Sequence, residues 1–133
     1  MPNWQPNWED VHWNYAEADA AAAQLDRNAD GLDGTLGAWH QGSTTATGEW
    51  RGVYRRRFDQ ELTGTLADAW RRAGEFREAA ARIRRATQWA RDEQARREHE
   101  RERWRREKAE EDARHAREQR AREERQRLAQ LAG

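Results

Sequence analysis

Side chains that bind metals or carry out acid–base and nucleophilic chemistry are sparse in this sequence. The histidines have neither H-x-x-x-H nor H-E-x-x-H spacing; they are His12, His40, His99 and His115. The single serine, Ser43, lies outside any G-x-S-x-G motif, and the absence of cysteine removes thiolate nucleophiles and zinc–thiolate sites. The loop from Gly42 to Gly48 has no lysine and no preceding strand pattern, so it does not match a phosphate-binding loop. These residues predict a protein that is not an enzyme and that has no catalytic residue, metal ligand or cofactor.

Eight tryptophans are the unusual chemical feature of the chain: Trp4, Trp8, Trp13, Trp39, Trp50, Trp70, Trp89 and Trp104. Exposure of an indole is costly, its burial removes a large apolar area from water, and tryptophan is enriched at the centres of protein interfaces. The tryptophans therefore favour a surface that meets a partner. Packing on the flanks of a single helical hairpin is the alternative that the sequence leaves open.

Adjacent arginines raise the question of nucleic-acid binding: Arg55–Arg57, Arg71–Arg72, Arg84–Arg85 and Arg105–Arg106. Phosphate binding requires a net basic face that releases counterions. Acidic residues are interleaved with these arginines in nearly equal number, which cancels most of that field. Arginine as a solvated helix former, whose aliphatic stem covers apolar surface, is the favoured interpretation.

The composition limits the thickness of any core. The chain has 133 residues (15.7 kDa), enough for one small domain or one long helical element. Of its 47 apolar residues 24 are alanine, whereas Leu, Ile, Val and Phe together number 12. That share of the chain lies well under the roughly 20% at which compositions begin to look disordered. The fold must therefore be thin, with alanine-rich surfaces that meet each other or a partner.

The zero net charge hides a division along the chain. Residues 1–49 contain one basic and eight acidic residues, and residues 50–133 contain 24 basic and 17 acidic residues. Opposite charges of this kind favour antiparallel pairing of unlike helices, within one hairpin or between two. No apolar run approaches the ~18 residues of a membrane span, and the first ten residues lack the basic and apolar regions of a cleaved signal peptide.

Apolar residues that alternate at spacings of three and four predict two amphipathic helices. The first is expected at about residues 10–39 with Asn7 as its N-cap, and the second from about residue 50 with Thr47 as its N-cap. Three glycines, at 31, 34 and 37, either admit a second backbone closely or fray the first helix before it ends. The expected seam or interface residues are Tyr15, Leu25, Leu32, Leu36, Trp39, Leu62, Leu66, Phe76 and Ile83. The predicted fold is all-α, an antiparallel helical hairpin with its turn at about residues 40–50 that dimerises into a four-helix bundle.

The two ends of the chain differ from this hairpin. Residues 1–9 form a tail that contains tryptophan and the only prolines, whereas residues 10–95 form the hairpin. From residue 91 onward 26 of 43 residues are charged, and Trp104 is the only large apolar residue between Arg91 and Arg127. Acidic residues recur four positions before basic ones, which stabilises an isolated helix. Residues 96–133 are therefore expected to be a long, solvated, charged helical extension, with disorder as the alternative.

One motif at the turn suggests a family. Trp50-Arg51-Gly52 is a W-x-G tripeptide between two amphipathic helices, and Phe58 follows the tryptophan by eight positions. Over residues ~10–95 the chain resembles the hundred-residue W-x-G family of helical hairpins exported by type VII (ESX-type) secretion systems. The resemblance implies dimerisation with itself or a sister hairpin, contact with the export machinery or a larger effector, and location in the cytoplasm before secretion without a cleaved signal peptide.

The same resemblance implies an export signal of the form Y-x-x-x-[DE] after the core of the second helix. The nearest match runs from Trp89 to Glu93, with tryptophan in place of tyrosine. A flanking aromatic residue followed by a charged helix is the alternative explanation. The expected function is non-enzymatic protein–protein interaction as a secretion substrate or its accessory partner. The alternatives are a structural coiled-coil or spacer protein without a role in secretion and, less favoured, an arginine-rich nucleic-acid accessory protein.

Overall fold

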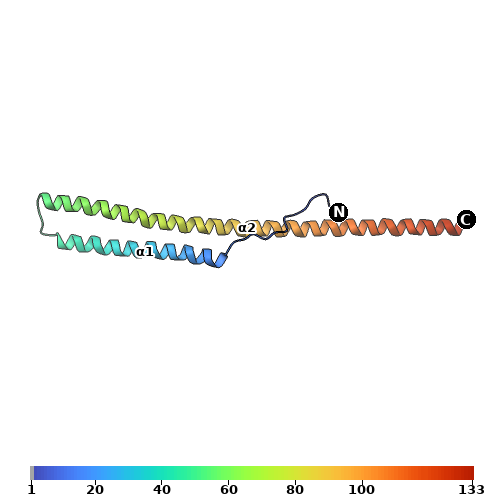
Figure 1. The fold of residues 1–133 in the computed structure, drawn as a ribbon, viewed down its shortest axis with the longest axis horizontal. Coiled ribbons are helices and arrows are strands. Elements are labelled where there is room, and N and C mark those ends of the chain that lie inside the picture. Colours follow the sequence, from blue (N-terminus) through green and yellow to red (C-terminus); the bar gives the residue numbers. More distant parts are fainter. Residues whose placement is uncertain (1) are drawn as a thin grey trace. The chain divides into compact units, whose positions relative to one another are not determined.

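The computed structural model describes residues 2–133, which form two α-helices and no strand (Figure 1). Helix α1 covers Tyr15–Ala46 and helix α2 covers Val53–Ala132. The chain divides into two compact units. The hairpin unit is Trp13–Trp89, and the second unit, here called the tail unit, combines residues 2–12 with Ala90–Gly133. Each unit is described by itself below.

Helix α1 begins later than the sequence predicts. Its N-cap is Asn14, whose side-chain oxygen accepts a hydrogen bond from the Glu17 backbone N–H at 3.0 Å. The predicted cap, Asn7, instead accepts from the Glu9 N–H at 2.9 Å, two residues ahead, which is the pattern of a local Asx turn. The prediction of a helix from about residue 10 is therefore wrong, because the first asparagine stabilises a turn and the second one caps the helix.

Helix α1 also ends later than predicted, and Thr47 closes it. Thr47 is buried, its backbone N–H donates to the Ser43 carbonyl oxygen at 3.0 Å, and its hydroxyl donates to the same oxygen at 2.7 Å. The prediction that this threonine starts the second helix is wrong. The three glycines at 31, 34 and 37 do not fray the helix, which continues to Ala46, and within the described chain nothing lies within 4 Å of a Cβ built on any of them.

The connection between the helices spans residues 47–52, which is shorter than the predicted turn. Gly52 has a φ of +97°, a conformation that glycine adopts at little cost and other residues adopt with strain. The Arg55 guanidinium crosses the connection: it donates to the carbonyl oxygens of Thr47 and Trp50 and pairs with the Asp59 carboxylate at 2.9 Å. The arginine thus links the C-cap residue of α1 and the carbonyl of Trp50 in the connection to the first turns of α2.

The core of the hairpin unit is a stripe of small residues, as its composition requires. The buried side chains are seven residues apart on each helix: Ala22, Ala29 and Leu36 on α1, and Leu66, Ala73, Ala80 and Thr87 on α2. Two helices therefore pack through a heptad seam, and the prediction of an all-helical fold with a helical hairpin agrees with the structure. Because most of these side chains are alanine, the apolar area that one hairpin buries is small.

Ion pairs fix the register of α1 against α2 along one edge of this seam. The Arg77 guanidinium contacts the carboxylates of Asp30 at 2.8 Å and Asp33 at 2.5 Å, and Arg84 pairs with Asp26 at 2.6 Å. The hydrogen bonds that Arg77 donates to Asp30 and Asp33 raise the pKa of Arg77 above its ordinary value. These pairs are solvent-exposed, so they contribute more to alignment than to stability.

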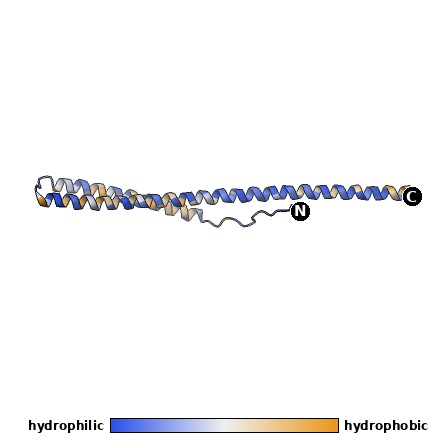
Figure 2. Cartoon of the chain, turned by 90° about the horizontal axis from the view of Figure 1, so that it is seen from above, coloured by the Kyte–Doolittle hydropathy of each residue, from blue (hydrophilic) through white to orange (hydrophobic). Residues whose placement is uncertain are grey.

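In the tail unit, α2 continues without a break to Ala132. Its charged side chains pair along the helix surface, as Arg97 with Glu93 at 3.0 Å and Arg96 with Glu100 at 2.9 Å. Figure 2 shows that hydrophilic residues dominate this part of the helix. Beyond residue 111 every side chain of α2 is exposed.

The conformation of Gly52 generates a prediction. Replacement by alanine (Gly52→Ala) places a Cβ at positive φ and is expected to lower the free energy of unfolding by about 1–2 kcal/mol. Gly34→Ala is the matched control, because Gly34 is helical with open space at its Cβ position, and we expect it to raise that free energy by about 0.5–1 kcal/mol. Urea unfolding followed by circular dichroism at 222 nm measures both. Equal effects of the two variants would contradict the assigned bend.

Candidate functional site

The bend of the hairpin unit brings together the residues of the W-x-G motif. The rings of Trp50 and Phe58 lie edge to face, with centroids 5.9 Å apart and an interplanar angle of 77°. Gly52 supplies the left-handed backbone position between them. Trp50 nevertheless remains 51% exposed, so the ring does not close a core at the bend. The predicted turn motif is thus assembled as a surface feature.

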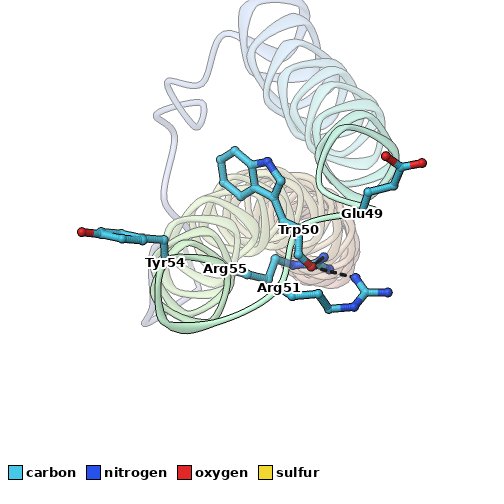
Figure 3. Close-up of a pocket in the computed structure, with 5 residues that line it drawn as sticks. All are labelled: Glu49, Trp50, Arg51, Tyr54 and Arg55. Carbon is cyan, nitrogen blue, oxygen red and sulfur yellow. Dashed lines mark hydrogen bonds between the residues drawn. The ribbon is translucent and has the colours of Figure 1, made fainter.

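An open hollow of about 580 Å³ lies at this bend, lined by Glu49, Trp50, Arg51, Tyr54 and Arg55 (Figure 3). The Arg51 guanidinium is tied to the backbone, because it donates to the Gly48 carbonyl at 3.0 Å and the Trp50 carbonyl at 2.7 Å. The rings of Trp50 and Tyr54 point in different directions (Figure 3), and Tyr54 is 82% exposed. Aromatic and basic groups on an open surface suit contact with a partner better than acid–base chemistry.

The predicted seam residues fall into three groups. Leu36 and Leu66 are buried. Partly buried are Tyr15, Leu25, Leu32, Leu62 and Ile83. Trp39 and Phe76 are exposed, at 59% and 37%, and so lie outside the buried seam of the hairpin.

The residues of the predicted export signal belong to different units. Trp89 closes the hairpin unit and is exposed. Glu93, in the tail unit, pairs with Arg96 at 2.6 Å and Arg97 at 3.0 Å. Hydrogen bonds from Arg96 and then Arg97 lower the pKa of the Glu93 carboxyl to about 2. The acid that the resemblance singles out is therefore already engaged by two arginines of its own helix.

The tail unit contains a site that the sequence analysis missed. Residues 2–12 have no regular secondary structure and lie along α2 (Figure 1), where Trp104 is the buried centre of the contact. The Trp8 ring meets the Trp104 ring edge to face at 5.4 Å. The Trp104 indole N–H donates to the Trp4 carbonyl at 2.9 Å, and the Trp4 indole N–H donates to the Glu107 carboxylate at 2.6 Å. The neighbouring indoles of Trp4 and Trp8 are thereby brought to Trp104, which is 100 residues from Trp4 in sequence.

Cations of α2 cover these rings. Arg103 lies over the Trp4 ring at 4.3 Å from its centroid, Arg105 over Trp8 at 5.5 Å, and Lys108 over Trp104 at 5.4 Å. Such pairs are favourable by about 0.5–1 kcal/mol each at exposed sites. They also give the adjacent arginines Arg105 and Arg106 a structural context, because at least the first of them contacts an indole.

Polar side chains of α2 form hydrogen bonds with the backbone groups of residues 2–12. The Arg101 guanidinium donates to the carbonyl oxygens of Asn7 at 2.9 Å and Glu9 at 2.6 Å and to the Asp10 carboxylate at 2.8 Å. The Gln94 side-chain oxygen accepts from the Val11 N–H at 2.8 Å, and its amide donates to Asp10 at 2.9 Å. A segment outside any helix or sheet has no backbone partners of its own, and these side chains supply them.

The order of contacts shows that the segment is extended and antiparallel to α2. Trp4 contacts Glu107 and Val11 contacts Gln94, so seven residues of the segment match thirteen of the helix. A helix rises 1.5 Å per residue and an extended chain about 3.1 Å, which gives about 20 Å and 22 Å for the two stretches. The two rises therefore agree with an extended backbone along the helix.

A signal for this site was present in the sequence. Counted in sevens from Leu66, the seam positions of α2 continue past Thr87 to Gln94 and Arg101. A second set of positions, also seven apart and three residues after the first set, consists of Ala90, Arg97 and Trp104. The spacing is kept while the residue type changes from apolar to polar, which fits a change of partner from an alanine-rich helix to an extended backbone.

The remaining findings concern metals, membranes and relatives. Within residues 2–133 no group of three or more His, Asp or Glu side chains is arranged to hold a metal ion. In the same described part of the chain, neither helix has the length and apolar character needed to cross a membrane. No protein-family model matches the sequence, and the searches of curated proteins and of solved structures found no match.

The Asp10 contacts generate a prediction about pH. The Gln94 hydrogen bond, followed by the Arg101 hydrogen bond and charge, lowers the pKa of Asp10 below its usual 3.8. A group with a lowered pKa stabilises the docked segment above its free pKa, and that contribution is lost as the pH falls through the lowered value. We therefore expect hydrogen exchange of residues 2–12 to accelerate below pH about 4, after correction for the intrinsic rate.

Asp10→Asn is the control for this prediction, because an amide keeps an acceptor oxygen but does not titrate. Its segment is expected to exchange faster than the wild-type segment at pH 6 and to show a smaller change between pH 6 and pH 3. An identical pH profile in the two proteins would contradict the role given to Asp10.

Proposed function

We propose that this chain is a non-enzymatic protein–protein interaction module in which the helical hairpin dimerises into a four-helix bundle. In this proposal it acts as a W-x-G-like type VII secretion substrate or as an accessory partner of one. The observation that carries the proposal is the set of exposed aromatic rings on a hairpin with an alanine core. Trp39, Trp50, Trp70 and Trp89 are between 43% and 61% exposed, and Phe76 is 37% exposed.

Dimerisation is supported by a comparison of the apolar side chains that one hairpin buries with those that it leaves exposed. One hairpin buries alanine, leucine and threonine along its seam and leaves its largest rings in water. Full burial of one large side chain is favourable by about 1.5–3 kcal/mol, so a second hairpin that covers these partly exposed rings gains a share of that for each ring. The acidic first 49 residues and the basic remainder also favour antiparallel contact between unlike helices of two copies.

The bend supports the resemblance to W-x-G proteins. Trp50 and Phe58 are in contact, and Gly52 occupies the one left-handed backbone position described, so both letters of the motif have a physical role. The partners proposed on this basis are a second copy or a sister hairpin, together with the export machinery or a larger effector. Trp89 and Glu93 are the residues proposed to present an export signal.

The proposal predicts that the chain is a dimer at micromolar concentration. Analytical ultracentrifugation is expected to give twice the 15.7 kDa chain mass. Trp39→Ala combined with Trp70→Ala should raise the dissociation constant at least tenfold, because truncation of one central interface tryptophan costs about 2 kcal/mol or more. Leu131→Ala, at an exposed position of the tail unit outside both the hairpin and the contacts of residues 2–12, is the control and should leave the dissociation constant unchanged. A helical monomer at these concentrations would contradict the bundle.

A spacer role is the second candidate, favoured by the run of paired charges on α2. Arg96 with Glu100 and Arg103 with Glu107 lie four residues apart, as in solvated single helices. Release into the culture medium only when a type VII export ATPase is intact separates the two roles. Retention in cells with a working ATPase would leave the spacer role as the better account.

A further inference from the structure

The face of α2 that holds the N-terminal segment has the properties of a peptide-binding surface. This docking face consists of Gln94, Arg97, Arg101, Trp104 and Glu107, all within the tail unit. Its residues recur at spacings of three and four, so they lie on one side of the helix.

The docking face recognises backbone and side chains by separate means. Arg101 and Arg97 donate to main-chain carbonyls, including that of Glu9 at 2.6 and 3.1 Å, and Gln94 accepts a main-chain N–H. These contacts require an extended ligand, because a helical one would use the same groups internally. Glu107 accepts an indole N–H, whereas Trp104 contacts both kinds of group, because its ring meets the Trp8 ring and its N–H donates to the Trp4 carbonyl.

The bound segment defines the chemistry of the ligand. Pro-Asn-Trp occurs twice, at residues 2–4 and 6–8, so two tryptophans lie four residues apart before an acidic pair. Both indoles are held: Trp4 by Glu107 and Trp8 by Trp104. The acid Asp10 is bound by Gln94 and Arg101. The matching ligand is therefore an extended segment with two such indoles and a following carboxylate.

We propose that this face also binds its ligand in trans, and that the ligand is the N-terminal segment of a second copy of the chain. A second copy presents the same residues, so every contact that forms within one chain can form between two. The chain's own segment then acts as a built-in competitor. Exchange is accessible because the segment forms no helix or strand and is held by side-chain contacts, most of which are exposed.

The chain's own N-terminal segment determines how weakly a free segment binds to the docking face. A tethered segment has an effective concentration in the millimolar range, so the face is free in only a small fraction of molecules. The apparent dissociation constant for a free segment is divided by that fraction. The face of the wild-type chain should therefore bind a free peptide weakly, and weakening of its own segment should make the binding tighter.

A fluorescently labelled peptide of residues 2–12 (PNWQPNWEDVH) tests this inference on the full chain. The tested chain has Trp4→Ala and Trp8→Ala, which remove both indoles from the competitor and leave the docking face intact. Fluorescence anisotropy is expected to show binding to this chain at least tenfold tighter than to the wild type. Leu131→Ala, an exposed position of the tail unit outside the docking face, is the control and should bind the peptide as weakly as the wild type does.

Two further variants, made in the chain that carries Trp4→Ala and Trp8→Ala (the released chain), locate the binding. Trp104→Ala removes the central ring and Arg101→Gln removes the carbonyl donors, and each should reduce peptide binding at least tenfold. Circular dichroism verifies that α2 stays helical in both. The inference is overturned if the released chain does not bind the peptide, if the wild type binds it equally well, or if a scrambled peptide of the same composition binds as tightly. It does not depend on dimerisation of the hairpin, so its failure leaves the proposed function standing.

Discussion

The seven-residue spacing along α2 is the constraint on which both units depend. In the hairpin unit it places Leu66, Ala73 and Ala80 in the buried seam with α1. In the tail unit the same spacing places Arg101 and its neighbours against residues 2–12. Where the partner is a helix, its backbone is already hydrogen-bonded, so small apolar residues suffice. Where the partner is an extended segment, the positions need donors and acceptors, and arginine and glutamine provide them.

This division also explains how so thin a chain holds its parts together. With Leu, Ile, Val and Phe at 12 residues, no thick core is available, and alanine provides close contact at small area. In the tail unit, indoles provide the buried apolar area that alanine cannot, and Trp104 is nine-tenths buried there. In the hairpin unit most indoles remain exposed. The same residue type therefore stabilises one unit internally and leaves the other with a surface suited to a partner.

The hairpin could be predicted from the sequence because its signal is local: apolar spacings of three and four on both sides of a turn-rich stretch. The start of α1 could not be, because Asn7 and Asn14 both fit a helix cap. The choice between them depends on contacts from Asp10 and Val11 to Gln94, more than eighty residues away. The role of Thr47 at the turn could not be predicted either, because a threonine there can cap the start of one helix or the end of another. Its buried hydroxyl donates back to the Ser43 carbonyl, so it ends α1.

The docking face was missed for a related reason. Charged residues paired at four-residue spacing suggest a solvated helix, and most of α2 beyond residue 111 is one. Gln94, Arg97 and Arg101 have the same composition as that solvated stretch, and only their register with Trp104 distinguishes them. The W-x-G resemblance covers residues ~10–95 and carries no information about residues 2–9 or about α2 beyond residue 95.

The central claim is that α2 has the same seven-residue spacing in both units but packs against a helix in one and an extended segment in the other. It rests on the contact between Trp104 and residues 2–12. Hydrogen–deuterium exchange of the wild type and of Trp104→Ala tests it most directly. We expect exchange in residues 2–12 to be slowed in the wild type and to approach the rate of a free peptide in the variant. Exchange in α1 should be unchanged. Rapid exchange of residues 2–12 in both proteins would contradict the account.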